Sequence, residues 1–393
     1  MGLYVGRFSL CIIPHQREKR NLHIAITTLW FPHNKNPLYG IFIHAQAQAL
    51  AEYVDVTVLI ARRKLVPYHK TYTIGKVNVV ERGGPYLPNT SESRLDRWSK
   101  YYEKMYDEVD RNKKIDLIHC HDYIALYPTR KIHKRNGTPY VVTIHNTDFL
   151  RESVASWRAS YLTDAFDHSK KVISVGETLS QKLQAYTHQS NIINIPNIID
   201  THLFSYKVPP PTAPFKFLYV GIFEDRKRVM EMIEAFHHLN SKNAQLTFIG
   251  YGSLEKQMKK YIQTHGLQNQ IDILPPKSND ELTPYYQSHH CYISVSASET
   301  FGITVAEAMS CGLHILYNKS GGPEHFIAPI GCMLVEDTTP PNLANKMQEM
   351  MRSYDPMKSI QIRNHAVNTL SSESVVNKLL ALYQAAVALK NKE

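Results

Sequence analysis

The chain has 393 residues, which is long for one hydrophobic core and suits two domains of about 150 to 200 residues each. Hydrophobic residues make up 43% of it and charged residues 20%, a globular composition that excludes disordered and fibrous proteins. The net charge is +10, and the whole excess lies in residues 1–208, which carry 28 Lys and Arg against 18 Asp and Glu; residues 209–393 carry 17 of each.

Cysteine usage and the N-terminal segment indicate where the chain works. The five cysteines are scattered and form no CxxC pair, which argues against a disulfide framework and a structural zinc site; they are Cys11, Cys120, Cys291, Cys311 and Cys332. The apolar run at 8–14 is too short to span a bilayer, and basic residues follow it. We therefore expect a reducing cytoplasm, with neither a signal peptide nor a transmembrane helix, and treat residues 1–21 as an appendage.

Strands and helices are predicted to alternate through the first half of the chain. Strand-like runs occur at 23–31, 54–61, 77–82, 116–120, 140–145 and 171–175, and helical stretches at 43–53 and 95–110. This βα alternation is typical of a parallel sheet with helices on its faces. We expect a Rossmann-like domain over residues 22–207.

A proline-rich segment, VPPPTAP at residues 208–214, then interrupts the pattern, because it can continue neither a helix nor a strand. A second alternation follows, with strands at 215–221, 244–250, 271–275, 291–297 and 314–318 and helices between them. We place a domain boundary at 208–214 and a second Rossmann-like domain over 215–370. The last helix, within 371–393, has apolar residues at helical spacing.

The segment ETFGITVAE places two carboxylates, Glu299 and Glu307, on either side of a predicted strand-to-helix turn at Gly302. In doubly wound sheets, ligands bind beyond the carboxyl ends of the strands, where amides at helix N-termini attract anions. A phosphate is expected near Gly302 and Ile303. Glu307 lies four residues after Ile303 on the same helix face, within reach of a ribose diol. Taken alone, this pair also fits a capped helix with two solvated glutamates.

The longer segment SASETFGITVAEAMSCGLHIL, followed by GGPEHFI, resembles the donor-binding signature of retaining GT-B glycosyltransferases, the large family 4 group. The segments LYVGIFEDRKRVMEMIEAF, LTFIGYGSLEKQMKKYI and INIPNIIDTHLF resemble other parts of that family in the same order. The resemblance runs from about residue 22 to the C-terminus. It implies the GT-B fold, in which two Rossmann-like domains face a cleft, an N-terminal acceptor domain, a C-terminal nucleotide-sugar domain, and a last helix that returns to the N-terminal domain.

The resemblance also implies which residues act on the donor. Members of the family are thought to react on one face of the sugar, so catalysis would depend on stabilising charge on the leaving diphosphate. Arg226 and Lys227 match basic residues placed against the diphosphate, and His145 matches a histidine that contacts the donor sugar. Glu299 is expected on the other side of the diphosphate. The family often has an arginine directly after the strand glycine, where this chain has Ile222.

Donor binding is expected from a larger group of residues at loops and helix starts. Gly40 matches a glycine loop in the N-terminal half, reduced here from the frequent double glycine to Tyr39-Gly40. The other expected donor-binding residues are Gly221, Gly250, Gly252, Phe301, Gly302, Ile303, Thr304 and Glu307. His314 stands where the family commonly has proline, a departure expected to affect packing.

We expect no metal and no cofactor apart from the nucleotide-sugar substrate. His119 and His121 share a strand face, but they lack a third ligand, so packing or acceptor-side contacts are the favoured interpretation. The chain has no Asp-x-Asp pair of the kind that metal-dependent GT-A transferases use.

Together these features predict a cytoplasmic glycosyltransferase that moves a sugar, most simply from a UDP-linked donor, to a growing cell-surface polysaccharide or lipid-linked glycan. The alternatives are a sugar phosphorylase or nucleotide-sugar epimerase on the same fold, or a catalytically silent nucleotide-sugar-binding subunit. The basic clusters at 62–64 and 130–135 form either a docking patch for the anionic inner membrane surface or a solvated face. No nucleic-acid module accompanies the charge. The segment from Tyr68 to Glu92 is expected to be a loop that selects the acceptor.

Overall fold

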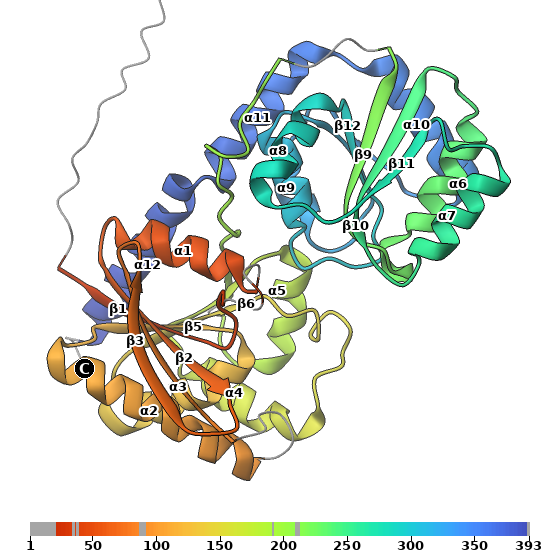
Figure 1. Ribbon diagram of the computed structural model, residues 1–393. Coiled ribbons are helices and arrows are strands. Elements are labelled where there is room, and N and C mark those ends of the chain that lie inside the picture. Colours follow the sequence, from red (N-terminus) through yellow and green to blue (C-terminus); the bar gives the residue numbers. More distant parts are fainter. Residues whose placement is uncertain are drawn as a thin grey trace, which may run out of the picture.

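The computed structural model describes residues 21–33, 36, 39–85, 92–190, 192–208 and 213–390. Within these ranges the chain forms two α/β domains, each built on a largely parallel sheet (Figure 1). This confirms the predicted fold class. The proposed appendage lies outside the described residues except for residue 21, as do residues 209–212 of the proline-rich connector.

The N-terminal domain has an eight-stranded sheet in the order β3-β4-β2-β1-β5-β6-β7-β8. Its strands are β1 (His23–Thr28), β2 (Asp55–Arg63), β3 (Tyr68–Ile74), β4 (Val77–Gly84), β5 (Leu117–His121), β6 (Tyr140–Ile144), β7 (Lys171–Ser174) and β8 (Ile192–Asn194). Its helices are α1 (Ile41–Ala51), α2 (Glu92–Asn112), α3 (Tyr123–Asn136), α4 (Ala159–Asp167) and α5 (Glu177–Leu183). Every residue of β1, β5 and β6 is buried, because helices cover both faces of this parallel sheet.

The Tyr68–Glu92 segment contains the predicted strand at 77–82, as β4, and also a second strand, β3, where a loop was expected. Residues 68–84 form a hairpin in which β3 pairs antiparallel with β4 at the sheet edge. Thr71, Tyr72 and Thr73 favour a strand, and the turn after Ile74 places Gly75 at φ 55°, a conformation suited to glycine. Loop character is thus ruled out for most of the segment, and residues 86–91 lie outside the described ranges.

The C-terminal domain has a six-stranded parallel sheet in the order β11-β10-β9-β12-β13-β14. Its strands are β9 (Phe215–Ile222), β10 (Ala244–Tyr251), β11 (Ile271–Leu274), β12 (Cys291–Ser294), β13 (His314–Tyr317) and β14 (Cys332–Leu334). Its helices are α6 (Val229–Leu239), α7 (Glu255–Thr264), α8 (Asn279–Ser288), α9 (Ile303–Ser310), α10 (Pro340–Ser353) and α11 (Pro356–Leu370). A cluster of buried apolar residues joins β9, β10 and β12 to α6 and α10.

The last helix, α12 (Ser372–Lys390), packs on the N-terminal domain although it follows the C-terminal one. Figure 1 shows it in blue beside α1 in red. Val375, Val376, Leu379 and Leu380 join the apolar cluster beneath α1 and β1. The hydroxyl of Tyr383 reaches farther, to Nδ1 of His119 on β5 at 2.6 Å.

The chain crosses between the domains at two adjacent segments. The amide of Ile199 donates to the carbonyl of Leu370 at 2.9 Å. This bond joins the segment that leaves the N-terminal domain to the segment that returns to it. Arg363 on α11 secures the same region. Its guanidinium donates to the carbonyls of Thr201, Phe204 and Ser310, at 2.6 to 2.8 Å. One side chain therefore joins the crossover segment to the C-terminal end of α9.

We predict that Arg363→Ala destabilises the protein by about 2–4 kcal/mol, because three carbonyls lose a charged donor in a partly buried site. Urea unfolding followed by circular dichroism measures the change. Arg352→Ala, which removes an exposed arginine at the end of α10, is the control and should change stability by less than about 0.5 kcal/mol. Equal losses in the two variants would contradict this role of Arg363.

Candidate active site

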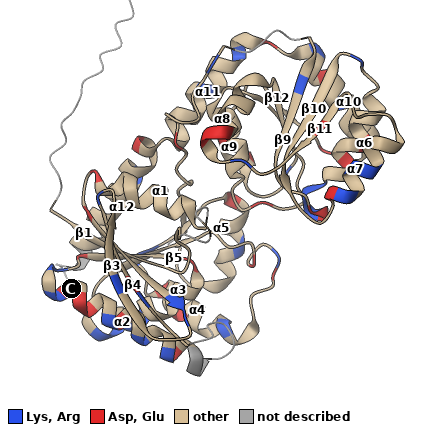
Figure 2. Ribbon diagram, in the orientation of Figure 1, with Lys and Arg blue, Asp and Glu red and all other residues tan. Residues whose placement is uncertain are grey.

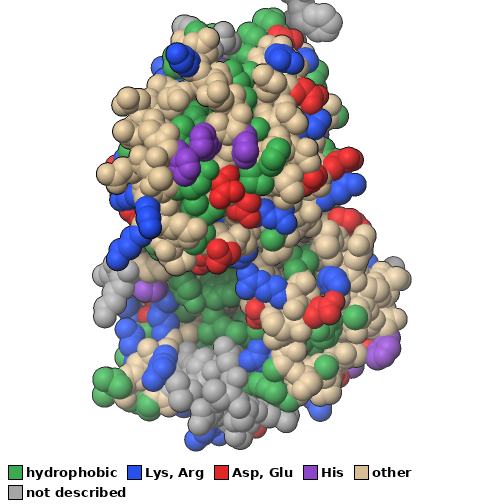
Figure 3. Space-filling view, turned by 90° about the vertical axis from the view of Figure 1, so that its right-hand side faces the viewer, with side chains coloured by type: hydrophobic (Ala, Val, Ile, Leu, Met, Phe, Trp, Pro, Cys, Tyr) green, Lys and Arg blue, Asp and Glu red, His purple; other side chains and the backbone are tan. Residues whose placement is uncertain are grey.

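A cavity of about 720 Å³ lies between the two domains and receives residues from both. Figure 3 shows the surface hollowed between the upper and lower halves of the molecule. Most of the residues predicted from the sequence line this cavity: Gly40, His145, Gly221, Arg226, Lys227, Glu299, Phe301, Gly302, Ile303 and Thr304. The structure thus brings together residues that lie up to 264 positions apart in the chain, from Gly40 to Thr304. Gly250, Gly252 and Glu307 are not among the lining residues.

The N-terminus of α9 faces the cavity. Gly302 caps this helix at φ 89°, and a Cβ there would lie 3.1 Å from Cγ of Pro323. The first bonds to the carbonyl of Gly302 come from the amides of Val305 and Ala306. Ile303 and Thr304 come before Val305 in the helix, so their amides are the donors that a helix start leaves without a partner inside the helix. This end of α9 is therefore suited to bind an anion.

A lysine from one loop and a glutamate from another meet beside that helix. Lys227, in the short turn after β9, forms an ion pair with Glu299, and both side chains are about 15% exposed. The backbone joins the same loops, because the amide of Ala297 donates to the carbonyl of Arg226 at 2.7 Å. Arg226 itself pairs with Glu224 at 3.0 Å. The charge on Lys227 is thus balanced within the protein and also available at the cavity wall.

Two of the predicted donor-binding glycines have a packing role in the structure. A Cβ on Gly250 would lie 1.9 Å from the carbonyl oxygen of Gly221, and one on Gly252 would lie 2.2 Å from that of Phe223. Both contacts are too close for any side chain. These glycines let β10 approach the backbone of the β9 loop, and Gly221 forms the cavity wall in front of them.

Glu307 is buried inside the domain rather than at the cavity wall. It is 6% exposed, and its carboxylate accepts a hydrogen bond from the hydroxyl of Tyr286 at 2.8 Å. Burial raises the pKa of Glu307 to about 7, and the bond from Tyr286 opposes part of that rise. Its expected contact with a ribose stays a prediction. The sequence did not reveal Tyr286, because its position opposite α9 depends on the fold.

We predict that this carboxylate makes stability fall as the pH rises. Between the ordinary pKa of 4.5 and the folded pKa of about 7, the folded state keeps a proton that the unfolded chain releases. Glu307→Gln, which has the same shape and does not titrate, should therefore be more stable than wild type by up to about 3 kcal/mol above pH 7. Urea unfolding between about pH 5 and 8 measures the difference.

The comparison isolates Glu307 from other groups. Burial also raises the pKa of Asp122 to about 7, with the same sign of pH dependence, but Asp122 is present in both proteins and cancels in the difference. Parallel stability curves for wild type and Glu307→Gln would contradict the raised pKa.

The N-terminal wall of the cavity contains His145, directly after β6, and Gly40, at the start of α1. Gly40 has φ 69°, and a Cβ there would lie 2.4 Å from the backbone of Trp30, so α1 can start against that segment only with glycine. The ring of His145 packs against that of Phe42, with the two ring centroids 4.6 Å apart. Sequence reasoning missed several other lining residues, because nothing in their spacing marks them: Trp30, Asn36, Phe42, Asn146, Thr147, Asn197 and Tyr251.

His119 and His121 lie inside the sheet, with ring centroids 4.2 Å apart. Both are fully buried. In the part of the chain that the structure describes, no group of three or more His, Cys, Asp or Glu side chains could hold a metal ion. The four described cysteines, Cys120, Cys291, Cys311 and Cys332, are free thiols.

Two α/β domains that face each other across a cavity are the arrangement of the GT-B fold. Family models agree: residues 203–366 match Glycosyl transferases group 1, and residues 40–203 match Glycosyltransferase Family 4. The chain belongs to this family of glycosyltransferases and is an enzyme of that class. The predicted resemblance is confirmed.

Proteins with similar sequences are glycosyltransferases by name, and some of the names specify a donor and an acceptor. An uncharacterised glycosyltransferase of Methanocaldococcus jannaschii is 24% identical over 65% of this chain and 71% of its own length. GDP-mannose:cellobiosyl-diphosphopolyprenol alpha-mannosyltransferase of Xanthomonas oryzae is 26% identical over 55% of this chain and 59% of its own length. The match with the latter thus spans less than two thirds of the relative.

Solved structures share the fold over nearly the whole chain. Sucrose-phosphate synthase from Thermosynechococcus elongatus superposes with a TM-score of 0.74 at 17% identity, over 94% of this chain and all of that one. The Anabaena protein HepE, in complex with UDP, superposes with a TM-score of 0.71 at 14% identity, over 93% of this chain and all of that one. At such identities, the likeness concerns the fold alone.

Proposed function

We propose that this protein is a retaining, metal-independent glycosyltransferase that moves a sugar from a nucleoside-diphosphate donor, UDP-linked, to a growing glycan on a lipid carrier. The observation that carries the proposal is the meeting of the α9 N-terminus, Lys227 and His145 in one cavity. The first two suit a diphosphate, and His145 comes from the opposite wall, where the sugar would lie.

The reaction breaks the bond between the anomeric carbon and the diphosphate oxygen and forms one to the acceptor oxygen on the same face of the sugar. The acceptor proton passes to the leaving diphosphate. The amides of Ile303 and Thr304, with Lys227, would stabilise the charge that gathers on the diphosphate. Among the described residues that line the cavity, Glu299 carries the one carboxylate. A mechanism with two carboxylates, as in glycosidases, therefore finds no second group there.

The donor nucleotide is the least constrained part of the proposal. Solved structures of the Anabaena protein contain UDP and UDP-glucose, which supports a UDP-linked donor. The name of the Xanthomonas relative specifies GDP-mannose and a diphosphopolyprenol acceptor. That name supports a nucleoside-diphosphate sugar and a lipid-linked acceptor, and it makes GDP the alternative base to test.

We predict that UDP stabilises the wild-type protein in a thermal-shift assay, by about 2.7 kcal/mol at 100 times its dissociation constant. Lys227→Ala should weaken UDP binding about 10- to 100-fold, because it removes a charged hydrogen-bond donor to phosphate. Lys242→Ala, at an exposed position away from the cavity, is the matched control. GDP, ADP and CMP run beside UDP identify the base.

Other outcomes favour the other readings of the fold. Stabilisation by orthophosphate and sugar phosphates, without any nucleotide effect, would point to a phosphorylase. Nucleotide binding without product from a panel of labelled nucleotide sugars and lipid-linked acceptors would point to a silent binding subunit. Transfer by wild type that fails in Lys227→Ala is the result expected of a glycosyltransferase.

For the lipid carrier, we propose that the N-terminal domain contacts an anionic membrane surface through the tip between β2 and β3. Leu65 and Val66 are 93% and 69% exposed there, directly after the exposed Arg63 and Lys64. An apolar tip beside basic residues suits the boundary of an anionic bilayer. No helix among the described residues is both long and apolar enough to cross a membrane.

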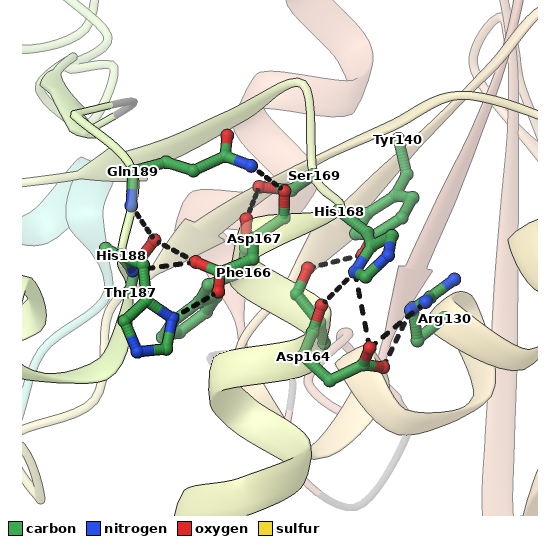
Figure 4. A network of polar contacts seen from close by, with 11 residues as sticks. Arg130, Tyr140, Asp164, Phe166, Asp167, His168, Ser169, Thr187, His188 and Gln189 are labelled. Carbon is green, nitrogen blue, oxygen red and sulfur yellow. Dashed lines mark hydrogen bonds and ion pairs between the residues drawn. The ribbon is translucent and has the colours of Figure 1, made fainter.

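The basic cluster at 130–135 is less suited to bind an anionic membrane than its sequence indicates. Arg130 makes two hydrogen bonds to Asp164 (Figure 4), and Lys131 pairs with Asp96. Arg135 is bonded to Asp107. Figure 2 shows acidic and basic residues interspersed along α2, beside this cluster. We therefore assign it to a solvated, charge-balanced face.

We predict that the protein floats with phosphatidylglycerol vesicles at low salt and is released as salt screens the charges. The double change Leu65→Ser and Val66→Ser should reduce vesicle binding several-fold, because it removes the apolar tip. Met357→Ser is the control, since Met357 is 72% exposed on the C-terminal domain. Wild type that ignores the vesicles, or equal binding by the two variants, would rule out the tip as a membrane contact.

A further inference from the structure

A row of buried polar side chains runs from His145 at the cavity wall into the N-terminal domain. Nε2 of His145 lies 3.0 Å from Nδ1 of His121 on β5. Nε2 of His121 lies 3.4 Å from the amide nitrogen of Gln46 on α1. His145, His121 and Gln46 are 8%, 0% and 5% exposed, so water has little access to any of them. We call this row the histidine relay.

A second group of hydrogen bonds holds the inner end of the relay. The amide nitrogen of Gln46 is also 3.3 Å from Nδ1 of His119. The hydroxyl of Tyr383 on α12 lies 2.6 Å from that His119 nitrogen. Nε2 of His119 is 2.6 Å from the hydroxyl of Thr143. Gln46 is therefore held between two imidazole rings, with its nitrogen toward both.

The chemistry of the amide determines where the protons are. An amide nitrogen only donates, so Nε2 of His121 must accept from Gln46. A neutral imidazole that accepts at Nε2 carries its proton on Nδ1, and His121 therefore donates to Nε2 of His145. His145 in turn must carry its own proton on Nδ1. Burial lowers the pKa of His145 to about 3 and that of His121 well below its ordinary value, which keeps both rings neutral.

The proton on His145 then has no hydrogen-bond partner among the residues that the structure describes. Nδ1 of His145 is buried and makes no hydrogen bond within the described residues. The rings of His145 and Phe42 are packed together, and both residues line the cavity, so the buried N–H belongs to a side chain that borders the space expected to hold the sugar. An unpaired buried donor costs free energy, and a hydroxyl of a bound sugar that accepted its hydrogen bond would recover that cost.

We propose that Gln46 and His121 are positioning residues that fix His145 as the Nδ1–H tautomer, so that it offers a hydrogen-bond donor to the sugar of the donor substrate. The inference rests on the proposed function for the identity of the ligand. The placement of the proton rests on the relay alone. Gln46 does not line the cavity, so its effect on the sugar passes through His121 and His145.

Nuclear magnetic resonance of protein with 15N-labelled histidine tests the proton placement directly, because the two ring nitrogens differ in shift and coupling in the two tautomers. The His145 signals are assigned by their loss in His145→Asn. We expect the Nδ1–H form in wild type, with or without any substrate. Observation of the Nε2–H form in wild type would overturn the proposal, and this measurement requires no variant of the relay to fold.

Gln46→Glu should reverse the relay with little change in volume. An ionised carboxylate only accepts, so at a pH where the introduced glutamate is ionised His121 would donate at Nε2, accept at Nδ1, and leave His145 with its proton on Nε2. Gln46→Met, which keeps the volume and removes the donor, should leave a mixture of tautomers. Tyr383→Phe, which removes a hydroxyl from His119 but keeps Gln46 and His121, should leave the His145 tautomer unchanged. An unchanged tautomer in folded Gln46→Glu, at a pH where the introduced carboxyl is ionised, would overturn the proposal.

Kinetics separates this role from a merely structural one. In Gln46→Glu, kcat/KM for the nucleotide sugar should fall about 10- to 100-fold, while affinity for the nucleoside diphosphate alone stays within about twofold. A parallel loss of both would indicate general damage to the domain and count against the proposal. If wild type neither bound nucleotide nor transferred sugar, the proposed function would fail, while the tautomer measurement would still decide the relay.

Discussion

The start of α9 is the constraint around which the cavity is arranged. Gly302 takes a left-handed conformation there, and the loop before it is bonded to two other loops. The amide of Ala297 donates to the carbonyl of Arg226, and the amide of Glu299 donates to that of Ser320. Three strand ends of the C-terminal sheet are thereby joined through backbone alone. The two free amides at the helix start consequently keep a fixed position beside Lys227.

Charge at this position is balanced before any ligand arrives. Lys227 and Glu299 are each mostly buried, and a lone charge at either position would be costly. As an ion pair they need no counterion from solvent. A diphosphate competes for Lys227 and gains the helix amides as well, whereas an uncharged sugar gains neither. The opposite wall is built differently, since its histidine, His145, is neutral and offers a hydrogen bond instead of charge. The two walls therefore suit the two parts of a nucleotide sugar.

Much of this arrangement could be predicted from the sequence, because local rules determine it. Runs such as those at 23–31 and 140–145 are apolar enough to be buried strands, and Gly302 before a helical run marks a helix start. What the sequence did not indicate depends on distant contacts. The β3–β4 hairpin lies in a segment whose tyrosines and glycines resemble a loop. The packing role of Gly250 is visible only when β9 lies beside β10, and the burial of Glu307 depends on Tyr286 from another helix. The histidine relay joins α1, β5 and β6, and no spacing in the chain indicates it.

A crystal structure of the protein with UDP would show whether the start of α9 and Lys227 bind the diphosphate. We expect the diphosphate to lie within hydrogen-bond distance of the amides of Ile303 and Thr304, with Nζ of Lys227 turned from Glu299 toward a phosphate oxygen. The same structure with a UDP-sugar would place the sugar against His145. A diphosphate bound away from α9, with the Lys227–Glu299 pair intact, would rule out this site for the donor.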